Sequence, residues 1–215
     1  MAKDTNYIQR ETCYQTKLRG ESIVKIKMKD RPSLAECRKN VPSLLRQATL
    51  CFLIRENEVL LAMKKRGFAE GKWNGVGGKK DESDNNIKEA ATRETQEEIG
   101  VTPSNLQLVA TLNFYHIGKG KDGQQVTVYI SDKWRGEPTE TEEMAPKWFE
   151  TNEIPYDEMW EDDRHWLPMI LAGEVIEGDF LFDDNQNLLE HDIRKVEGSN
   201  KGVKNTANKK REVAL

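Results

Sequence analysis

A glycine-rich loop that leads directly into a helix is the feature that most restricts how this chain can fold. Five glycines punctuate the stretch 67–78, a spacing that lets backbone approach a ligand closely. The run 87–99 then has high helix propensity and stops at Gly100, the expected C-terminal breaker. Three polar residues just ahead of that run are competent N-caps: Ser83, Asp84 and Asn85. The sequence therefore predicts one helix directly after a loop that can approach a ligand.

Strand-like runs surround this loop and helix. Two β-rich runs, 48–54 and 59–63, are separated by four polar residues and predict a hairpin. A second helix is expected over 163–172. Further strands are expected over 106–116, 125–131, 147–149, 180–182 and 188–193, the last two as a closing hairpin. Strands with helices inserted between them indicate an α/β or α+β sheet.

Charge divides the chain into three segments. Residues 1–46 carry 11 basic and 5 acidic side chains and residues 195–215 carry 6 and 2, whereas the whole chain has a net charge of −4, so the middle is strongly acidic. We predict a basic N-terminal extension over 1–46, one folded domain over 47–196 and a basic, disordered tail over 197–215. Within the extension, residues 24–29 alternate with period two, which is typical of a half-buried strand.

The same charge distribution and the apolar runs bear on partners and location. An acidic domain lacks the clustered Lys and Arg that contacts to duplex nucleic acid require, so we expect no duplex partner. The longest apolar run, 48–54, is far below the roughly 20 residues needed to cross a bilayer. The N-terminal residues lead into no apolar segment typical of a secretion signal. We expect a cytoplasmic protein without a membrane partner, and a monomer in preference to an oligomer.

Three carboxylates share one side of the predicted helix. Glu94 lies three residues before Glu97 and four before Glu98, so repulsion costs roughly 0.2–0.5 kcal/mol per pair. A Mg²⁺ or Mn²⁺ ion would offset this repulsion, since hard cations prefer oxygen ligands and magnesium commonly bridges substrate phosphates. Spacing alone leaves open a solvated acidic face, with an ordinary i,i+4 pair between Glu89 and Arg93.

The stretch GGKKDESDNNIKEAATRETQEEIGV resembles the signature of the Nudix hydrolases, Gly-x5-Glu-x7-Arg-Glu-aliphatic-x-Glu-Glu-x-Gly-aliphatic. Gly78 supplies the leading glycine. The later part matches position for position at Arg93, Glu94, Glu97, Glu98, Gly100 and Val101. Two departures concern the loop and the capping of the helix. One extra residue separates Gly78 from Arg93, so that the first glutamate falls on Asp84 or Asn85, and Thr95 replaces the aliphatic residue.

This resemblance implies a three-layer α/β/α sandwich around a mixed sheet, in which the loop and helix bind a divalent metal. Such a protein hydrolyses a nucleoside diphosphate linked to another group, and metals neutralise the phosphate charge and orient the attacking water. The implied metal ligands are Glu94, Glu97, Glu98 and Gly78. Arg93 would orient the glutamates, and Glu97 or Glu143 would act as the base. Mg²⁺ is the expected cofactor, with Mn²⁺ an alternative.

Segments on either side of the signature resemble the MutT-like branch of the family, the oxidised purine nucleoside triphosphatases: VLLAMKKRGFAEGKWNGVGGK and EEMAPKWFETNEIPYDEMWEDDRHWLP. They contain what a purine pocket needs, flat aromatic side chains and a few polar groups. The resemblance implies that Asn74, Asp162 and Asp163 read the base while Trp160 stacks on it. Further candidate lining residues are Thr49, Lys64, Phe68, Phe114, Met144 and Trp166. The alternative is that the tryptophans are core residues and that 161–163 is a solvated helix start.

We therefore expect Mg²⁺-dependent conversion of oxidised purine nucleoside triphosphates, such as 8-oxo-dGTP or 2-oxo-dATP, to the monophosphate and pyrophosphate, which sanitises the nucleotide pool. Two alternatives remain: a Nudix hydrolase of ADP-ribose, a dinucleoside polyphosphate or capped RNA, and a non-catalytic nucleotide-binding module. Adjacent carboxylates in an apolar pocket do not both ionise freely. Asp162 and Asp163 are accordingly expected to share a proton whose position adapts to the base.

Overall fold

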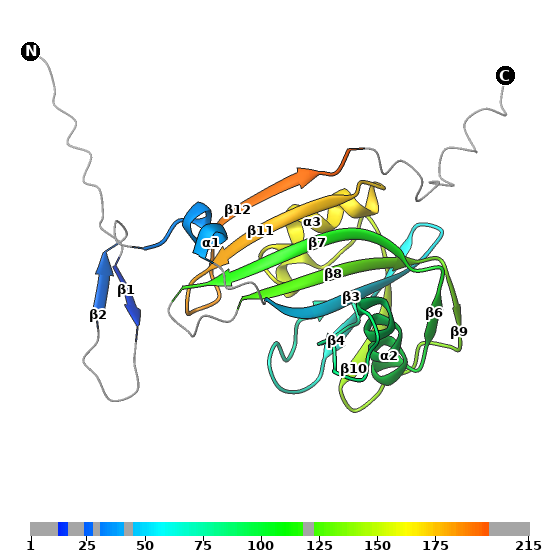
Figure 1. Ribbon diagram of the computed structural model, residues 1–215. Coiled ribbons are helices and arrows are strands. Elements are labelled where there is room, and N and C mark those ends of the chain that lie inside the picture. Colours follow the sequence, from blue (N-terminus) through cyan, green and yellow to red (C-terminus); the bar gives the residue numbers. More distant parts are fainter. Residues whose placement is uncertain (1–12, 17–23, 28–30, 41–44, 118–122, 198–215) are drawn as a thin grey trace, which may run out of the picture.

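The computed structural model describes residues 13–16, 24–27, 31–40, 45–117 and 123–197. Within them, one mixed sheet runs in the order β10 (Met144–Glu150), β4 (Glu58–Lys64), β3 (Arg46–Arg55), β8 (Gln124–Ser131), β7 (Gln107–His116), β11 (Ile176–Phe182) and β12 (Leu188–Lys195), with the short β5 (Trp73–Asn74) paired to β4 (Figure 1). The pairs β3–β8 and β7–β11 are parallel, and the other neighbours are antiparallel. Two small antiparallel pairs lie outside this sheet: β1 (Cys13–Thr16) with β2 (Val24–Lys27), and β6 (Thr102–Ser104) with β9 (Lys133–Arg135).

Helices cover both faces of the large sheet (Figure 1). They are α1 (Leu34–Asn40), α2 (Ile87–Ile99) and α3 (Asp163–Leu171), with a 3-10 turn over Tyr156–Glu158 ahead of α3. Successive residues of a strand point to opposite faces. On β3, Cys51 packs with Ile99 of α2, whereas Phe52 packs with Trp166 of α3. The chain therefore forms the three-layer α/β/α arrangement expected from the sequence.

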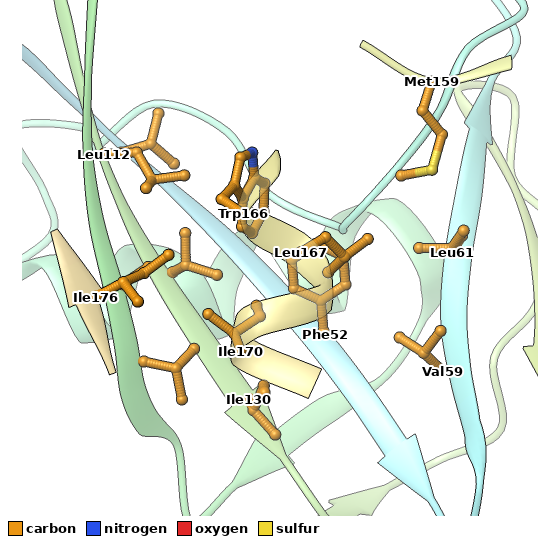
Figure 2. Packing of buried hydrophobic residues seen from close by; sticks show 14 of the residues in the cluster. Phe52, Val59, Leu61, Leu112, Ile130, Met159, Trp166, Leu167, Ile170 and Ile176 are labelled. Carbon is orange, nitrogen blue, oxygen red and sulfur yellow. The ribbon is translucent and has the colours of Figure 1, made fainter. Parts of the chain in front are cut away.

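The larger core lies between the sheet and α3 (Figure 2). Trp166, Leu167 and Ile170 of α3 are completely buried there, and the Trp166 ring meets Phe52 edge-on with centroids 6.0 Å apart. Burying each such side chain contributes roughly 1.5–3 kcal/mol. Because α3 is anchored in this way, the residues at its N-terminus are held at a fixed place against the sheet.

Part of the basic extension packs on the sheet, on the same side as α2. Leu34 of α1 is buried against Tyr115 and Leu181, and Leu181 points away from the α3 core. Arg38 donates from Nε to Asp179 Oδ2 at 2.9 Å and from Nη2 to Asp192 Oδ2 at 2.5 Å. The helix α1 is thus attached to β11 and β12 by apolar contact and by ion pairs.

Asp179 is the buried member of this ion-pair cluster, with 2% of its surface exposed. It also accepts hydrogen bonds from Asn113 Nδ2 at 3.0 Å, Tyr115 Oη at 3.2 Å and Arg194 Nη2 at 3.0 Å. Burial alone would raise the pKa of Asp179, but the hydrogen bonds from Asn113, Arg38 and Arg194 outweigh it and lower that pKa. The carboxylate is therefore stable as an anion only while these donors stay in place.

We expect Arg38→Met to lower the free energy of unfolding by about 2 kcal/mol at neutral pH. Breaking a buried ion pair costs roughly 3–5 kcal/mol, and the bond from Arg194 that remains on Asp179 keeps the loss below that range. Urea unfolding would measure it, with Lys39→Met as the matched control, because Lys39 is an exposed residue of the same helix. Equal stability of the two variants would show that Arg38 does not anchor α1.

Most of the predicted elements are confirmed. The first helix has the predicted bounds, the second ends one residue early at Leu171, and both predicted hairpins form. The strand predicted over 24–29 is present as β2 over residues 24–27, and its last two residues lie outside the described residues. The strand predicted over 180–182 begins earlier, at Ile176, because the small Gly178 and the polar Asp179 hide its apolar pattern. No signal in the sequence indicated α1, β1, β5, β6 and β9, which are short.

One local prediction is wrong. The N-cap of α2 is Asn86, whose Oδ1 accepts from the backbone N–H groups of Lys88 and Glu89 at 3.0 Å each. Asp84 does not serve as the cap because Arg93 holds its carboxylate, and Asn85 instead donates to the Glu89 side chain. Ser83 lies farther from the helix start, in the turn that precedes it.

In the described residues, no helix has both the length and the apolar character needed to cross a membrane. The disordered tail predicted over 197–215 lies outside the described residues except for Glu197.

Candidate active site

The glycine-rich loop passes over β3 and meets α2. Backbone bonds join Thr49 N to Gly78 O at 2.8 Å and Val76 N to Cys51 O at 3.1 Å. A Cβ on Gly77 would lie 2.1 Å from the Thr49 carbonyl oxygen, and one on Gly78 would lie 2.5 Å from the Glu94 carboxylate. Only glycine allows this approach. The loop backbone therefore lies directly against a carboxylate of the helix.

Arg93 links this loop to the acidic side of α2. Its guanidinium forms two hydrogen bonds to Asp84, at 3.0 Å and 2.8 Å, and Nη1 donates to both Glu94 and Glu97 at 3.0 Å. The hydrogen bonds from Arg93 lower the pKa of Asp84 to about 2, against the effect of burial. Of the two residues on which the first glutamate of the signature could fall, Asp84 pairs with the arginine. Asn85 does not.

Glu94 and Glu98 are the carboxylates most removed from water on this side. Glu98 is 7% exposed; its Oε2 accepts from Gly77 N at 3.0 Å and its Oε1 lies 3.4 Å from Lys64 Nζ. Burial raises the pKa of Glu98 and of Glu94, although Gly77 and Lys64 oppose this on Glu98 and Arg93 opposes it on Glu94. Further positive charge beside the buried Glu98 and the half-buried Glu94 would help both to remain ionised.

A divalent cation would supply such charge. No three His, Cys, Asp or Glu side chains of the described residues converge as a metal-binding group, and the Glu97 side chain is 59% exposed beside Arg93. Magnesium, however, is usually held by one or two carboxylates, with waters and substrate phosphates completing its shell. The groups that could hold it are the side chains of Glu94 and Glu98 and the backbone of Gly78. The more exposed Glu97 lies on the same helix as these two glutamates.

Glu143 lies near the same helix but is ion-paired. Its Oε1 accepts from Arg66 Nη2 at 2.7 Å, and its Oε2 lies 3.4 Å from Lys64 Nζ. These two partners, Arg66 first, lower the pKa of Glu143. Lys64 therefore bridges Glu143 and Glu98. A carboxylate whose pKa is lowered is a weaker proton acceptor, which bears on the choice between Glu97 and Glu143 as the base.

Aromatic rings gather beside the start of α3. Phe68, 74% exposed on the glycine-rich loop, stacks on Trp160 with ring centroids 5.4 Å apart and planes 29° apart. Lys72 Nζ lies 5.2 Å from the centroid of the Trp160 ring and donates to Met159 O at 2.8 Å. Asn74 is half-buried in β5, and its Oδ1 accepts from Gly75 N at 2.7 Å. The loop and the segment before α3 thus meet through stacked rings.

Two neighbouring carboxylates are buried at this point. Asp162 and Asp163 are 3% and 2% exposed. Asp162 Oδ2 accepts from Trp166 Nε1 at 2.9 Å and Asp163 Oδ2 accepts from Trp160 N at 3.0 Å. Burial raises the pKa of Asp162 to about 6, and burial followed by the charge of Asp162 raises the pKa of Asp163 well above its ordinary value. Burial and the neighbouring charge therefore both favour the protonated form of this pair, which is the direction that a shared proton requires.

The remaining predicted pocket residues divide between the faces of the sheet. Phe114 stacks on Phe180 at 5.3 Å in the core beneath α3. Trp166 is completely buried in that core, and its Nε1 donates to Asp162 Oδ2. Thr49 is buried, and its Oγ1 has no hydrogen-bond partner among the described residues. Met144 instead packs in the cluster beneath α2, with Cys51 and Ala91.

Lys72 and Arg66 contact this site but were not identified from the sequence. Arg66 directly precedes the glycine-rich loop, and Lys72 lies within it, directly before Trp73. A lysine or arginine in a charged, polar loop gives no signal of its own, because its contacts here, with Met159, Trp160 and Glu143, are made more than 70 residues away along the chain.

The chain is similar to known proteins in sequence and in fold. The family model of the NUDIX domain matches residues 44–170. The mouse (Mus musculus) "Oxidized purine nucleoside triphosphate hydrolase" is 38% identical over 155 residues, covering 72% of this chain and 98% of that protein. The zebrafish (Danio rerio) protein of the same name is 40% identical over 149 residues, covering 69% and 94%. In its fold, the chain is similar to a MutT protein from Bacillus halodurans, with a TM-score of 0.62, 24% identity and coverage of 69% and 97%.

Proposed function

The chain belongs to the Nudix family, and from that membership we propose that it hydrolyses oxidised purine nucleoside triphosphates, such as 8-oxo-dGTP or 2-oxo-dATP, to the monophosphate and pyrophosphate. The bond broken is the anhydride between the α- and β-phosphates, and water supplies the oxygen and the proton. The substrate class is that in the names of the mouse and zebrafish relatives. The reaction would remove damaged precursors from the nucleotide pool.

The observation that carries this proposal is the continuity of one loop between two chemically different regions. The segment 64–78 reaches the buried acids of α2 through Lys64 and Gly77, and it reaches the aromatic rings ahead of α3 through Phe68. Carboxylate oxygens are suitable ligands for a metal ion that also binds phosphates. Aromatic rings with polar neighbours are suitable for binding a purine. A nucleotide bound along this loop would have its phosphates at one end and its base at the other.

At the phosphate end, the proposed metal ligands are Glu94, Glu98 and the Gly78 backbone, with Glu97 as a ligand or proton acceptor. Bound Mg²⁺ would neutralise phosphate charge and make water a better nucleophile. The chain's own residues position these groups. Arg93 fixes Glu94 and Glu97, while the Gly77 N–H group fixes Glu98. We favour Glu97 over Glu143 as the base because Glu97 pairs with one cation, Arg93, whereas Arg66 and Lys64 both pair with Glu143 and lower its pKa.

At the base end, Trp160 and Phe68 provide flat surfaces for stacking. Asn74 offers an amide donor beside an acceptor, which matches a purine edge. Burial raises the pKa of both Asp162 and Asp163, so a proton kept on the pair would let one carboxyl donate while the other accepts. Oxidation at position 8 or position 2 of a purine rearranges its donors and acceptors, and a movable proton can match either arrangement.

Pyrophosphate release from a panel of nucleotides, measured with and without Mg²⁺, tests this proposal. We expect 8-oxo-dGTP and 2-oxo-dATP to be hydrolysed at least tenfold more efficiently than dGTP and dATP, and no turnover in excess EDTA. Equal kcat/KM for oxidised and ordinary purines would contradict the pocket assignment. Preference for ADP-ribose, a dinucleoside polyphosphate or capped RNA would replace the substrate class, and no hydrolysis of any of them would indicate a binding module.

A further inference from the structure

Lys72 occupies a position at which the glycine-rich loop closes on itself. Its backbone N–H donates to Ala69 O at 3.0 Å, and its carbonyl accepts from Lys64 N at 3.0 Å. These two bonds fix the lysine at the base of the loop, immediately before β5. Its side chain is half-buried. A lysine that gives up part of its hydration in this way requires compensating contacts.

The compensating contacts all come from the segment that carries the proposed base-reading residues. Lys72 Nζ donates to the Met159 carbonyl at 2.8 Å and lies 5.2 Å from the centroid of the Trp160 ring. An ammonium group over an indole face is attracted to it by roughly 0.5–2 kcal/mol. Trp160 N in turn donates to Asp163 Oδ2 at 3.0 Å. Trp160 therefore contacts both the Lys72 ammonium and Asp163 of the buried acidic pair.

Several charged or titratable groups face that pair. The negative charge of Glu161 disfavours ionisation of Asp162 and so raises its pKa. The positive charge of Lys72 favours ionisation of both Asp162 and Asp163 and so lowers the pKa of each. Tyr156, in the 3-10 turn ahead of α3, also faces Asp163; burial and then the charge of Asp163 raise the pKa of its hydroxyl, so it stays neutral. Arg164, the residue after Asp163, is directed instead to Asp157 at 3.0 Å. Lys72 is thus the cation whose charge acts on both aspartates.

We propose that Lys72 is a positioning residue for base recognition: its ammonium group holds negative charge on the Asp162–Asp163 pair and seats the Trp160 ring. It thereby helps to decide which oxidised purine the pocket accepts at a given pH. This inference rests on the proposed function, because it assigns a role within the same base pocket. The competing account is that Lys72 is only a tether between the loop and Met159, without influence on the acids.

The direct test is a carboxyl ¹³C NMR titration of aspartate-labelled protein, with the two signals assigned from Asp162→Asn and Asp163→Asn. Lys72→Met keeps the apolar stem and removes the charge, Lys72→Arg restores a cation, and Lys133→Met removes an exposed charge of β9 as the matched control. We expect Lys72→Met to raise the titration midpoint of the pair by about one pH unit. We expect Lys72→Arg and Lys133→Met to remain close to wild type.

A kinetic experiment then connects the titration to base choice. The ratio of kcat/KM for 8-oxo-dGTP to that for 2-oxo-dATP is measured from pH 5 to pH 9. We expect the pH at which this ratio changes to be higher in Lys72→Met than in wild type, by the same amount as the NMR midpoint. In Lys72→Arg we expect it to return to the wild-type pH. An increase in KM that is equal at every pH, with the midpoint unmoved, would show a tether only and overturn the proposal. The NMR titration needs no substrate, so it separates this failure from failure of the proposed function.

Discussion

Replacing Glu98 by glutamine is expected to lower kcat for pyrophosphate release by about a thousandfold, which corresponds to roughly 4 kcal/mol in the barrier. The amide preserves the shape of the side chain and can still accept from Gly77 N, but it cannot supply the negative charge that a divalent cation requires. Burial already raises the pKa of Glu98, so a neutral group at this place does not strain the fold. Initial rates at saturating Mg²⁺ and nucleotide measure the effect.

The matched control is Glu137→Gln, which removes an exposed carboxylate from the segment between β9 and β10. Thermal unfolding of both variants shows whether the loss is chemical or structural. We expect Glu98→Gln to unfold at or above the wild-type temperature, because an unfavourable buried charge has been removed. Turnover within tenfold of wild type would exclude Glu98 as a metal ligand.

Asp163→Asn is expected to separate the two oxidised substrates, shifting the ratio of their kcat/KM values by about a hundredfold. The wild-type pair can exchange a proton between two carboxyls, whereas the variant always presents an amide at position 163. One arrangement of donors and acceptors is retained and the other is lost, which leaves buried polar atoms of the disfavoured base unpaired. Measuring kcat/KM for 8-oxo-dGTP and 2-oxo-dATP from pH 6 to pH 9 tests this. Wild-type rates with both nucleotides throughout would eliminate the shared-proton hypothesis.

The same variant is also expected to change how the stability of the folded protein depends on pH. The pKa of Asp163 is raised in the folded protein, so the wild type is most stable where this group is protonated and loses stability as pH rises through that raised pKa. Asparagine does not titrate. We therefore expect Asp163→Asn and wild type to unfold at similar temperatures near pH 5, and the variant to be the more stable protein at pH 9. A difference that stays the same from pH 5 to pH 9 would mean that the carboxyl ionises in the folded protein without penalty.

The sheet and the first helix were predictable because their signals are local. The run Ile87–Ile99 has high helix propensity and ends at glycine, and β3 and β4 are continuous apolar runs around a polar turn. The clustering of Glu94 and Glu98 against the glycine-rich loop was also foreseeable, since helix periodicity places both on one side. Here the sequence and the structure agree because neighbours along the chain determine the result.

Contacts between distant segments explain what the sequence did not reveal. The choice of Asp84 over Asn85 as the partner of Arg93 depends on how the loop folds back over nine residues. Met144 lies beneath α2 because β10 pairs with β4 in a particular register. The position of Lys72 against Trp160 exists only once the loop has met α3. None of these follows from propensity or periodicity.

The attachment of Arg38 to Asp179 affects where this protein can be cut. The family match covers residues 44–170, so both members of that ion pair lie outside it, and so do β11 and β12. A fragment limited to the matched residues would lack Ile176 and Phe180 of the core beneath α3, and β7 would become an unpaired edge strand of the sheet. The unpaired backbone N–H and C=O groups of an exposed edge strand promote self-association. We therefore expect a fragment that folds stably to include α1, β11 and β12 in addition to the matched residues 44–170.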